Sequence, residues 1–253
     1  GIGKNAPFAV TPLRTVFYAS RFENKDGESE YLTMGKTVLT SFKDSNSSFK
    51  DSEGFWGNDG KPICEMSNLP KWLHKEDNGL KVIIPGFEID DPTEWIWSFT
   101  LILIINFFTA IIDKRISFNL NQKQIKINAE TIKTLFYKEE LKNASINLNY
   151  KTELKQAQKF FEVLTSPDKH SSIVNINNFG KFKIEILLSD DGLKKVLFTR
   201  NGICIANSLA HHKLKHFQET SGFYAIVRPE QPYGEASKNL RELETPQHLS
   251  LIH

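Results

Sequence analysis

The sequence has little cysteine, and its cysteines are not spaced as metal or disulfide sites require. Cys64 and Cys204 are its two cysteines, and they form no Cys-x-x-Cys pair. This argues against a disulfide framework and fits a reducing cytoplasm, where each thiol is expected to be a small core residue. No serine lies in a Gly-x-Ser-x-Gly motif, and a serine hydrolase is therefore not supported.

The chain also lacks a large excess of charge. Its formal net charge is +2, which gives no general electrostatic reason to bind nucleic acid or an anionic membrane. The first twenty residues lack the basic-then-apolar order of a signal peptide, and we expect a cytoplasmic location. Because the chain starts at Gly1 without a methionine, we expect it to be a piece of a longer protein.

One long apolar run, Trp95–Ile112, has nearly the length of a membrane span. Asp91-Pro92-Thr93-Glu94 before it is typical of a helix that begins in water, with an N-cap, a proline at the first position and a glutamate at the third. Polar residues recur along one helical stripe within and just after the run, namely Ser98, Asn106, Thr109 and Asp113. We therefore predict a buried helix packed against a sheet, and no membrane.

Composition and patterning predict a two-domain α+β protein. The chain has 253 residues, of which 40% are hydrophobic, enough for two modest cores. We place the first domain at residues 1–122 and the second at 123–253. In the first domain the predicted sheet contains Thr15–Arg21, Lys36–Phe42 and Leu80–Ile84, with the apolar helix across one face.

The second domain is expected to begin with helices at Thr131–Lys142 and Thr152–Leu164. A strand-rich block follows, and Asp190-Asp191-Gly192 predicts a hairpin turn within it. A helix is expected at Ala236–Leu243. The predicted strands are Ser171–Ile176, Phe179–Ser189, Lys194–Thr199, Ile203–Ala206 and Tyr224–Arg228.

The opening residues, Gly1-Ile2-Gly3-Lys4-Asn5, suggest a phosphate-binding turn before a helix at Ala6–Leu13. Glycines let an anion approach the backbone closely, and free N–H groups at a helix start can bind it. A Walker A loop would need a serine or threonine after Lys4, where the chain has Asn5, and a strand before the glycines. The turn therefore departs from a P-loop.

The turn, the following helix and the strand at Thr15–Arg21 together resemble the ATP lid of the GHKL superfamily of gyrase, heat-shock chaperone, histidine kinase and MutL ATPases. The resemblance continues at Asn78-Gly79-Leu80, where these proteins carry Gly-Thr before a buried strand. It extends to the run that begins at Pro85-Gly86-Phe87 and to the later Thr199–Asn207 segment. Leu80 replaces the family threonine and removes a hydroxyl.

This resemblance implies a partial Bergerat-type α/β sandwich followed by a transducer-like α+β domain. It implies ATP and Mg²⁺ as ligands, with phosphates bound by Gly1, Ile2, Gly3, Lys4 and Asn5. Gly79 would lie next to the nucleotide, and Arg200 is one candidate for the basic residue that reaches the γ-phosphate. The family's Asn-bearing helix and Asp-x-Gly-x-Gly motif do not occur in residues 1–253; we expect them before Gly1.

Two functions stay open on these grounds. The first is ATP binding with slow hydrolysis that drives a conformational change, in a bacterial protein that could form a homodimer. Its further partner would be another protein or a DNA-processing factor. The second is a non-enzymatic interaction module in which the glycine turn is only a turn. His212 and His216 share a helical spacing but have no third ligand and lie among lysines, and we expect no metal site.

Overall fold

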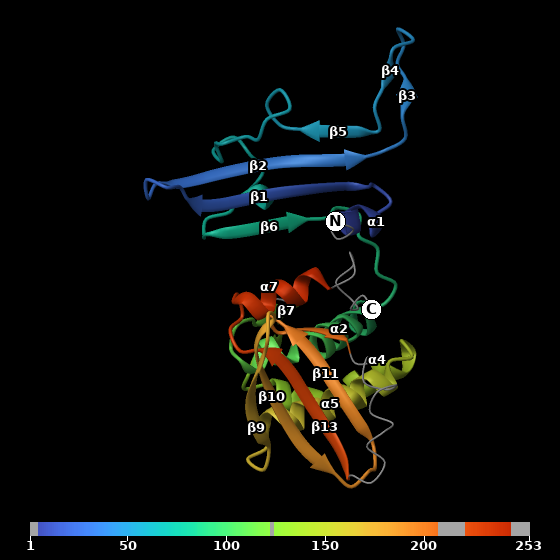
Figure 1. Ribbon diagram of the computed structural model, residues 1–253. Helices are drawn as coiled ribbons and strands as arrows, with labels where there is room; N and C mark the ends of the chain where they lie inside the picture. The colour runs from blue at the N-terminus through green and yellow to red at the C-terminus, as the bar shows by residue number, and fades with distance from the viewer. Residues whose placement is uncertain (1–4, 122–123, 207–220, 244–253) are drawn as a thin grey trace. The chain divides into compact units, whose positions relative to one another are not determined.

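The computed structural model describes residues 5–121, 124–206 and 221–243, and its secondary structure is mixed α+β, as the sequence predicted (Figure 1). The chain separates into two compact units, Gly1–Asp90 and Asp91–His253. The division falls before the long apolar helix rather than near residue 122. The helix therefore belongs to the second unit, and the two units are described separately.

The first unit is built on one antiparallel sheet. Its strand order is β5-β2-β1-β6, with a short helix, α1 (Ala6–Ala9), before β1. The strands predicted at Thr15–Arg21 and Leu80–Ile84 are confirmed. The one predicted at Lys36–Phe42 is displaced, because β2 ends at Val38 and Phe42 starts a separate hairpin. The strands are β1 (Thr15–Glu23), β2 (Ser29–Val38), β3 (Phe42–Lys43), β4 (Phe49–Lys50), β5 (Glu53–Trp56) and β6 (Gly79–Ile83).

The two faces of this sheet are covered differently. On one face the segment around η2 (Lys71–Leu73) packs on the strands, where the Tyr31 hydroxyl donates to the Leu73 carbonyl at 2.9 Å. Side chains alternate between faces along a strand, which places Phe22, Leu80 and Val82 together on the opposite face. These three are 36%, 62% and 43% exposed, and this part of the opposite face is therefore apolar and uncovered.

The long apolar helix, α2 (Pro92–Ile112), starts where the sequence predicted. The Asp91 carboxylate accepts hydrogen bonds from the Thr93 and Glu94 backbone N–H groups, at 2.7 and 3.1 Å. The helix has the length and composition of a membrane span. Its core-facing side chains Leu101, Ile104 and Ile111 are fully buried within the second unit.

The predicted partner of α2 was wrong. We expected the helix to lie across the sheet of the first unit, but within the second unit it packs on three helices, α3, α4 and α5, and on strand β12 (Ile203–Ala206). Thr109, expected on a polar stripe, is fully buried. The helix at Thr131–Lys142 is also broken in two between Phe136 and Glu139. The helices are α3 (Ile132–Phe136), α4 (Glu139–Asn147) and α5 (Lys151–Thr165), and a small hairpin of β7 (Phe118–Leu120) and β8 (Ile125–Ile127) precedes them.

A five-stranded sheet completes the second unit, in the order β12-β11-β13-β10-β9. Leu197 and Ile226 face the α2–α5 core, whereas Phe182 and Val227 face α7 (Glu235–Glu242) on the other side. The sheet thus lies between two helical layers. Its strands are β9 (His170–Ile176), β10 (Gly180–Ser189), β11 (Lys194–Arg200), β12 (Ile203–Ala206) and β13 (Gly222–Pro229).

The hairpin predicted at Asp190-Asp191-Gly192 does not form a paired ladder. β13 lies between β10 and β11 and pairs with both, antiparallel to the first and parallel to the second. Gly222, the first residue of β13, permits this insertion. A Cβ there would lie 2.6 Å from the Ser189 carbonyl oxygen and 2.9 Å from the Gly192 nitrogen. The turn signal predicted the chain reversal but not which strands would pair.

Candidate functional site

The residues predicted to bind phosphate lie at the edge of the described structure. Gly1, Ile2, Gly3 and Lys4 fall outside the described residues. Asn5 precedes α1, and its side chain makes no capping hydrogen bond. The helix predicted at Ala6–Leu13 is shorter and ends at Ala9. A single helical turn has a small dipole, and any anion site here would depend on backbone N–H groups and on Lys4.

Gly79 has a clear structural reason to be glycine. It starts β6 opposite Arg21, and its φ of +131° is a conformation that other residues rarely adopt. A Cβ would meet nothing closer than the Lys75 side chain, at 3.9 Å. The structure thus explains this glycine through the backbone turn into β6.

Arg200 lies beside a cavity of the second unit but does not line it. It ends β11 before Asn201-Gly202, whose φ values of +53° and +81° form a tight turn into β12. Thr199 and Asn201 line the cavity, and Arg200 is not among the lining residues. Successive side chains of a strand point to opposite faces of the sheet. Arg200 therefore lies on the face that does not carry Thr199.

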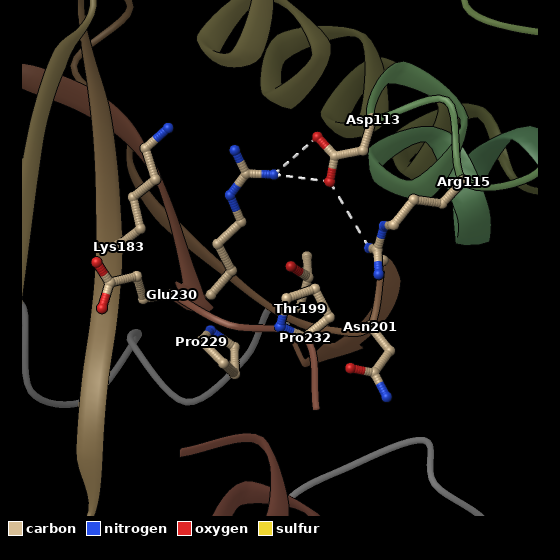
Figure 2. Close-up of a pocket in the computed structure, with 10 residues that line it drawn as sticks. Asp113, Arg115, Lys183, Thr199, Asn201, Pro229, Glu230 and Pro232 are labelled. Atoms are coloured by element: carbon tan, nitrogen blue, oxygen red, sulfur yellow. Dashed lines mark hydrogen bonds and ion pairs between the residues drawn. The ribbon is translucent and has the colours of Figure 1, made fainter. Parts of the chain in front are cut away.

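The cavity has a volume of about 270 Å³. It opens where β10 begins, where β11 and β13 end, and where the chain leaves α2 (Figure 2). Its lining residues carry several charges, two prolines and a buried threonine. They are Asp113, Arg115, Lys183, Thr199, Asn201, Gly202, Arg228, Pro229, Glu230 and Pro232.

A buried carboxylate, Glu185 on β10, contacts two of the residues that line the cavity, Lys183 and Arg228. It is 1% exposed, and three cations surround it. Lys169 and Lys183 place their Nζ atoms 3.0 and 3.2 Å from Oε1, and Arg228 places Nη2 2.8 Å from Oε2. No hydrogen bond of good geometry from the described residues reaches either oxygen, so the carboxylate charge is balanced by ion pairs.

Arg228 connects Glu185 to a second carboxylate, Asp113. Its Nη1 donates to Asp113 Oδ1 and Oδ2 at 3.1 and 3.0 Å. Arg115 Nη2 lies 3.6 Å from the same Asp113 Oδ2. A continuous charge network thus runs from Lys169, just before β9, through β10 and β13 to Asp113 at the end of α2, and Figure 2 shows its Asp113 and Arg115 part.

The electrostatic environment keeps Glu185 ionised. Burial alone would raise the pKa of this carboxyl, but Arg228, Lys169 and Lys183 outweigh burial and lower its pKa. Elsewhere in the unit, burial raises the pKa of the Cys204 thiol to about 12. That thiol is therefore protonated at neutral pH and a poor nucleophile, as expected for a core cysteine. Cys64 is exposed, contrary to the expectation that it lies in a core.

Among the described residues, no group of three or more His, Cys, Asp or Glu side chains is placed to hold a metal ion. His212 and His216 lie outside those residues.

Sequence reasoning missed the charge network, although β10 carried a signal for it. Lys183 and Glu185 alternate with apolar residues, and both therefore lie on the sheet face that also carries Leu187 of the core. Charges at core-facing positions of a strand predict either a buried ion pair or a polar site. Their partners Arg228 and Asp113 are far away in sequence and could not be assigned without the pairing of β10 with β13.

Comparison of the chain with protein-family models, with curated proteins and with solved structures finds no match.

Proposed function

We propose that this chain is part of an ATP-binding protein of the GHKL type that couples its nucleotide state to a conformational change, with slow hydrolysis. The observation that carries the proposal is an order of elements. Gly1-Ile2-Gly3-Lys4-Asn5 directly precedes α1 and β1, and β6 returns beside β1 with Gly79 as its first residue. This is the order that the resemblance of the glycine turn implies for an ATP lid.

In this proposal the phosphates are bound by the backbone N–H groups of Gly1 to Asn5, and Lys4 adds a positive charge. The glycines permit close approach of the anion because they have no side chain. Mg²⁺ would arrive with the nucleotide. The described residues supply no cluster of acidic ligands for it, and no step proposed for them depends on a metal.

The uncovered sheet face of the first unit supports a partial α/β sandwich. Phe22, Leu80 and Val82 expose apolar surface on one face, and a sheet with such a face needs a second layer. In a Bergerat-type sandwich helices form that layer. In this proposal a helical layer of that kind covers the apolar face.

A second candidate function is a non-enzymatic interaction module. The exposed aromatic surface of the first unit favours it. The β3–β4 hairpin carries Phe42 and Phe49, which are 56% and 75% exposed, and Phe55 on β5 is 52% exposed. Exposed apolar patches mark protein interaction sites. Leu80 also favours this alternative. It stands where the family has a threonine, and leucine cannot make the hydroxyl contact to the nucleotide that the threonine would make.

Equilibrium titration of the protein in its natural length with ATP, ADP and AMP separates the two candidates. A phosphate-binding lid predicts affinity that increases with the number of phosphates, and weak binding of every nucleotide by the 253-residue chain. Equal affinity for ATP and AMP, or no binding at all, would contradict the nucleotide proposal and leave the interaction module. Tight binding by residues 1–253 would show that the adenine and metal contacts were wrongly assigned.

A further inference from the structure

The cations around the cavity of the second unit outnumber the carboxylates of the described residues there, and two carboxylate oxygens are each shared by two cations. Glu185 Oε1 is shared by Lys169 and Lys183, and Asp113 Oδ2 is shared by Arg228 and Arg115. In each shared contact the longer distance belongs to a cavity-lining cation, 3.2 Å for Lys183 and 3.6 Å for Arg115. These two cations are held less tightly than their competitors.

The charge balance of the region is positive. Among the described residues, four cations (Lys169, Lys183, Arg115 and Arg228) and three carboxylates (Asp113, Glu185 and Glu230) lie at or next to the cavity, which leaves a formal charge of +1. Lys183 and Arg115 side chains are 35% and 31% exposed. They lie on different sides of the cavity and come from β10 and from the segment after α2 (Figure 2).

The size and the remaining lining restrict what could bind. About 270 Å³ is at the lower limit of small-molecule sites, enough for a phosphate group with a few further atoms. Pro229 and Pro232 supply apolar wall, and Asn201 adds amide donors. Arg228 is held by both Asp113 and Glu185, which fixes its guanidinium as a rigid cationic wall.

We propose that this cavity binds a phosphate group, free or on a small ligand, between Lys183 and Arg115. Charge-assisted hydrogen bonds to an oxyanion would give both cations the acceptor that the shared carboxylate oxygens supply incompletely. The site is built from residues of the second unit alone, and this proposal does not depend on the nucleotide proposal. The competing account is a purely structural ion network, in which the two cations need no ligand.

Titration of the natural-length protein with inorganic phosphate and with glycerol phosphate, at constant ionic strength, tests the proposal. The variants are Lys183→Gln and Arg115→Gln. Both leave the carboxylates paired, because Glu185 keeps Lys169 and Arg228 while Asp113 keeps Arg228. Matched controls are Lys155→Gln and Arg241→Gln, at exposed positions of α5 and α7. Circular dichroism checks that each variant is folded.

We expect each cavity variant to weaken binding by about tenfold, ~1.4 kcal/mol, while the controls leave it unchanged. Tighter binding of glycerol phosphate than of phosphate would identify a phosphorylated small molecule as the ligand. Tighter binding of free phosphate would identify the ion itself. Gly3→Val should leave phosphate binding at this cavity intact, which separates this test from that of the nucleotide site. No binding, or equal losses in cavity variants and controls, would overturn the proposal.

A second measurement needs no variant. Phosphate should raise the unfolding temperature of the wild-type protein above that in chloride of equal ionic strength, because a ligand that binds the folded state stabilises it. Lys183→Arg should retain this shift, since it keeps the charge. An equal unfolding temperature in both salts would contradict the site.

Discussion

Arg228 of β13 binds Asp113 with one amino group, Nη1, which donates to both carboxylate oxygens at 3.1 and 3.0 Å. Asp113 directly follows α2, so this contact ties the end of the buried helix to the central strand of the sheet. The other amino group of Arg228 meets Glu185. One side chain thus joins three elements that are far apart in sequence.

Replacing Arg228 with methionine should destabilise the second unit strongly. Asp113 would lose its two hydrogen bonds, and Glu185 would keep only the two lysines among its three cations. Breaking a buried ion pair typically costs about 3–5 kcal/mol, and we expect a loss of about 3 because Glu185 remains partly paired. Urea unfolding measures it. Asp113→Asn, at a partly exposed position, is the control and should cost about 1 kcal/mol or less; equal costs for the two variants would contradict a role for Glu185.

The stability of the second unit should depend on pH through Glu185. The pKa of this carboxyl is lowered in the folded state, and the folded state therefore binds its proton less readily than the unfolded state does. Its contribution to stability is present above the unfolded pKa, near 4.5, and is lost as pH falls through the folded pKa. Unfolding free energies of wild type and Glu185→Gln should converge as the pH is lowered below about 4.5. A constant difference between pH 7 and pH 3 would contradict this assignment.

A side chain at Gly202 should destabilise the second unit, because α2 packs directly on this glycine. A Cβ would lie 2.4 Å from Ala110 Cβ, and the Thr109 hydroxyl donates to the Gly202 carbonyl at 2.8 Å. Its φ of +81° adds strain for any other residue. Gly192→Ala is a matched control, with a φ of +70° and open space around it.

The control measures the cost of the left-handed conformation alone, about 1–2 kcal/mol. Gly202→Ala should cost roughly 1–3 kcal/mol more, from overpacking against α2. Thermal or urea unfolding of both variants gives the difference. Equal destabilisation would show that α2 does not constrain this turn.

The helix α2 shows what the sequence could and could not predict. The start of the helix could be predicted from Asp91-Pro92-Thr93-Glu94, because helix capping is a local interaction within these four residues. Its partners did not follow, because an apolar helix fits any apolar surface and nothing local selects one. Charged residues at core-facing positions, such as Glu185, indicated a polar cluster, but their partners depended on the placement of β13. β13 is placed by its pairing with β10, which is distant in sequence, and Gly222 permits the close approach at the start of β13.

We predict that the protein stays monodisperse without detergent, although α2 has the length and composition of a membrane span. Leu101, Ile104, Phe108 and Ile111 are at most 1% exposed and already have apolar partners in the core of the second unit. Size-exclusion chromatography with light scattering measures the state of the purified protein. Aggregation that only detergent reverses would indicate that α2 lies in a lipid bilayer instead.

The central claim is that the glycine turn binds nucleotide phosphates, and calorimetry with a non-hydrolysable ATP analogue on the natural-length protein tests it most directly. In Gly3→Val a branched side chain would obstruct the phosphate, and affinity should fall by about tenfold or more, ~1.4 kcal/mol. Gly27→Asn, in the open turn between β1 and β2 where φ is +81°, is the control, because asparagine tolerates this backbone conformation, and it should bind like wild type. Unchanged affinity in Gly3→Val would contradict the claim.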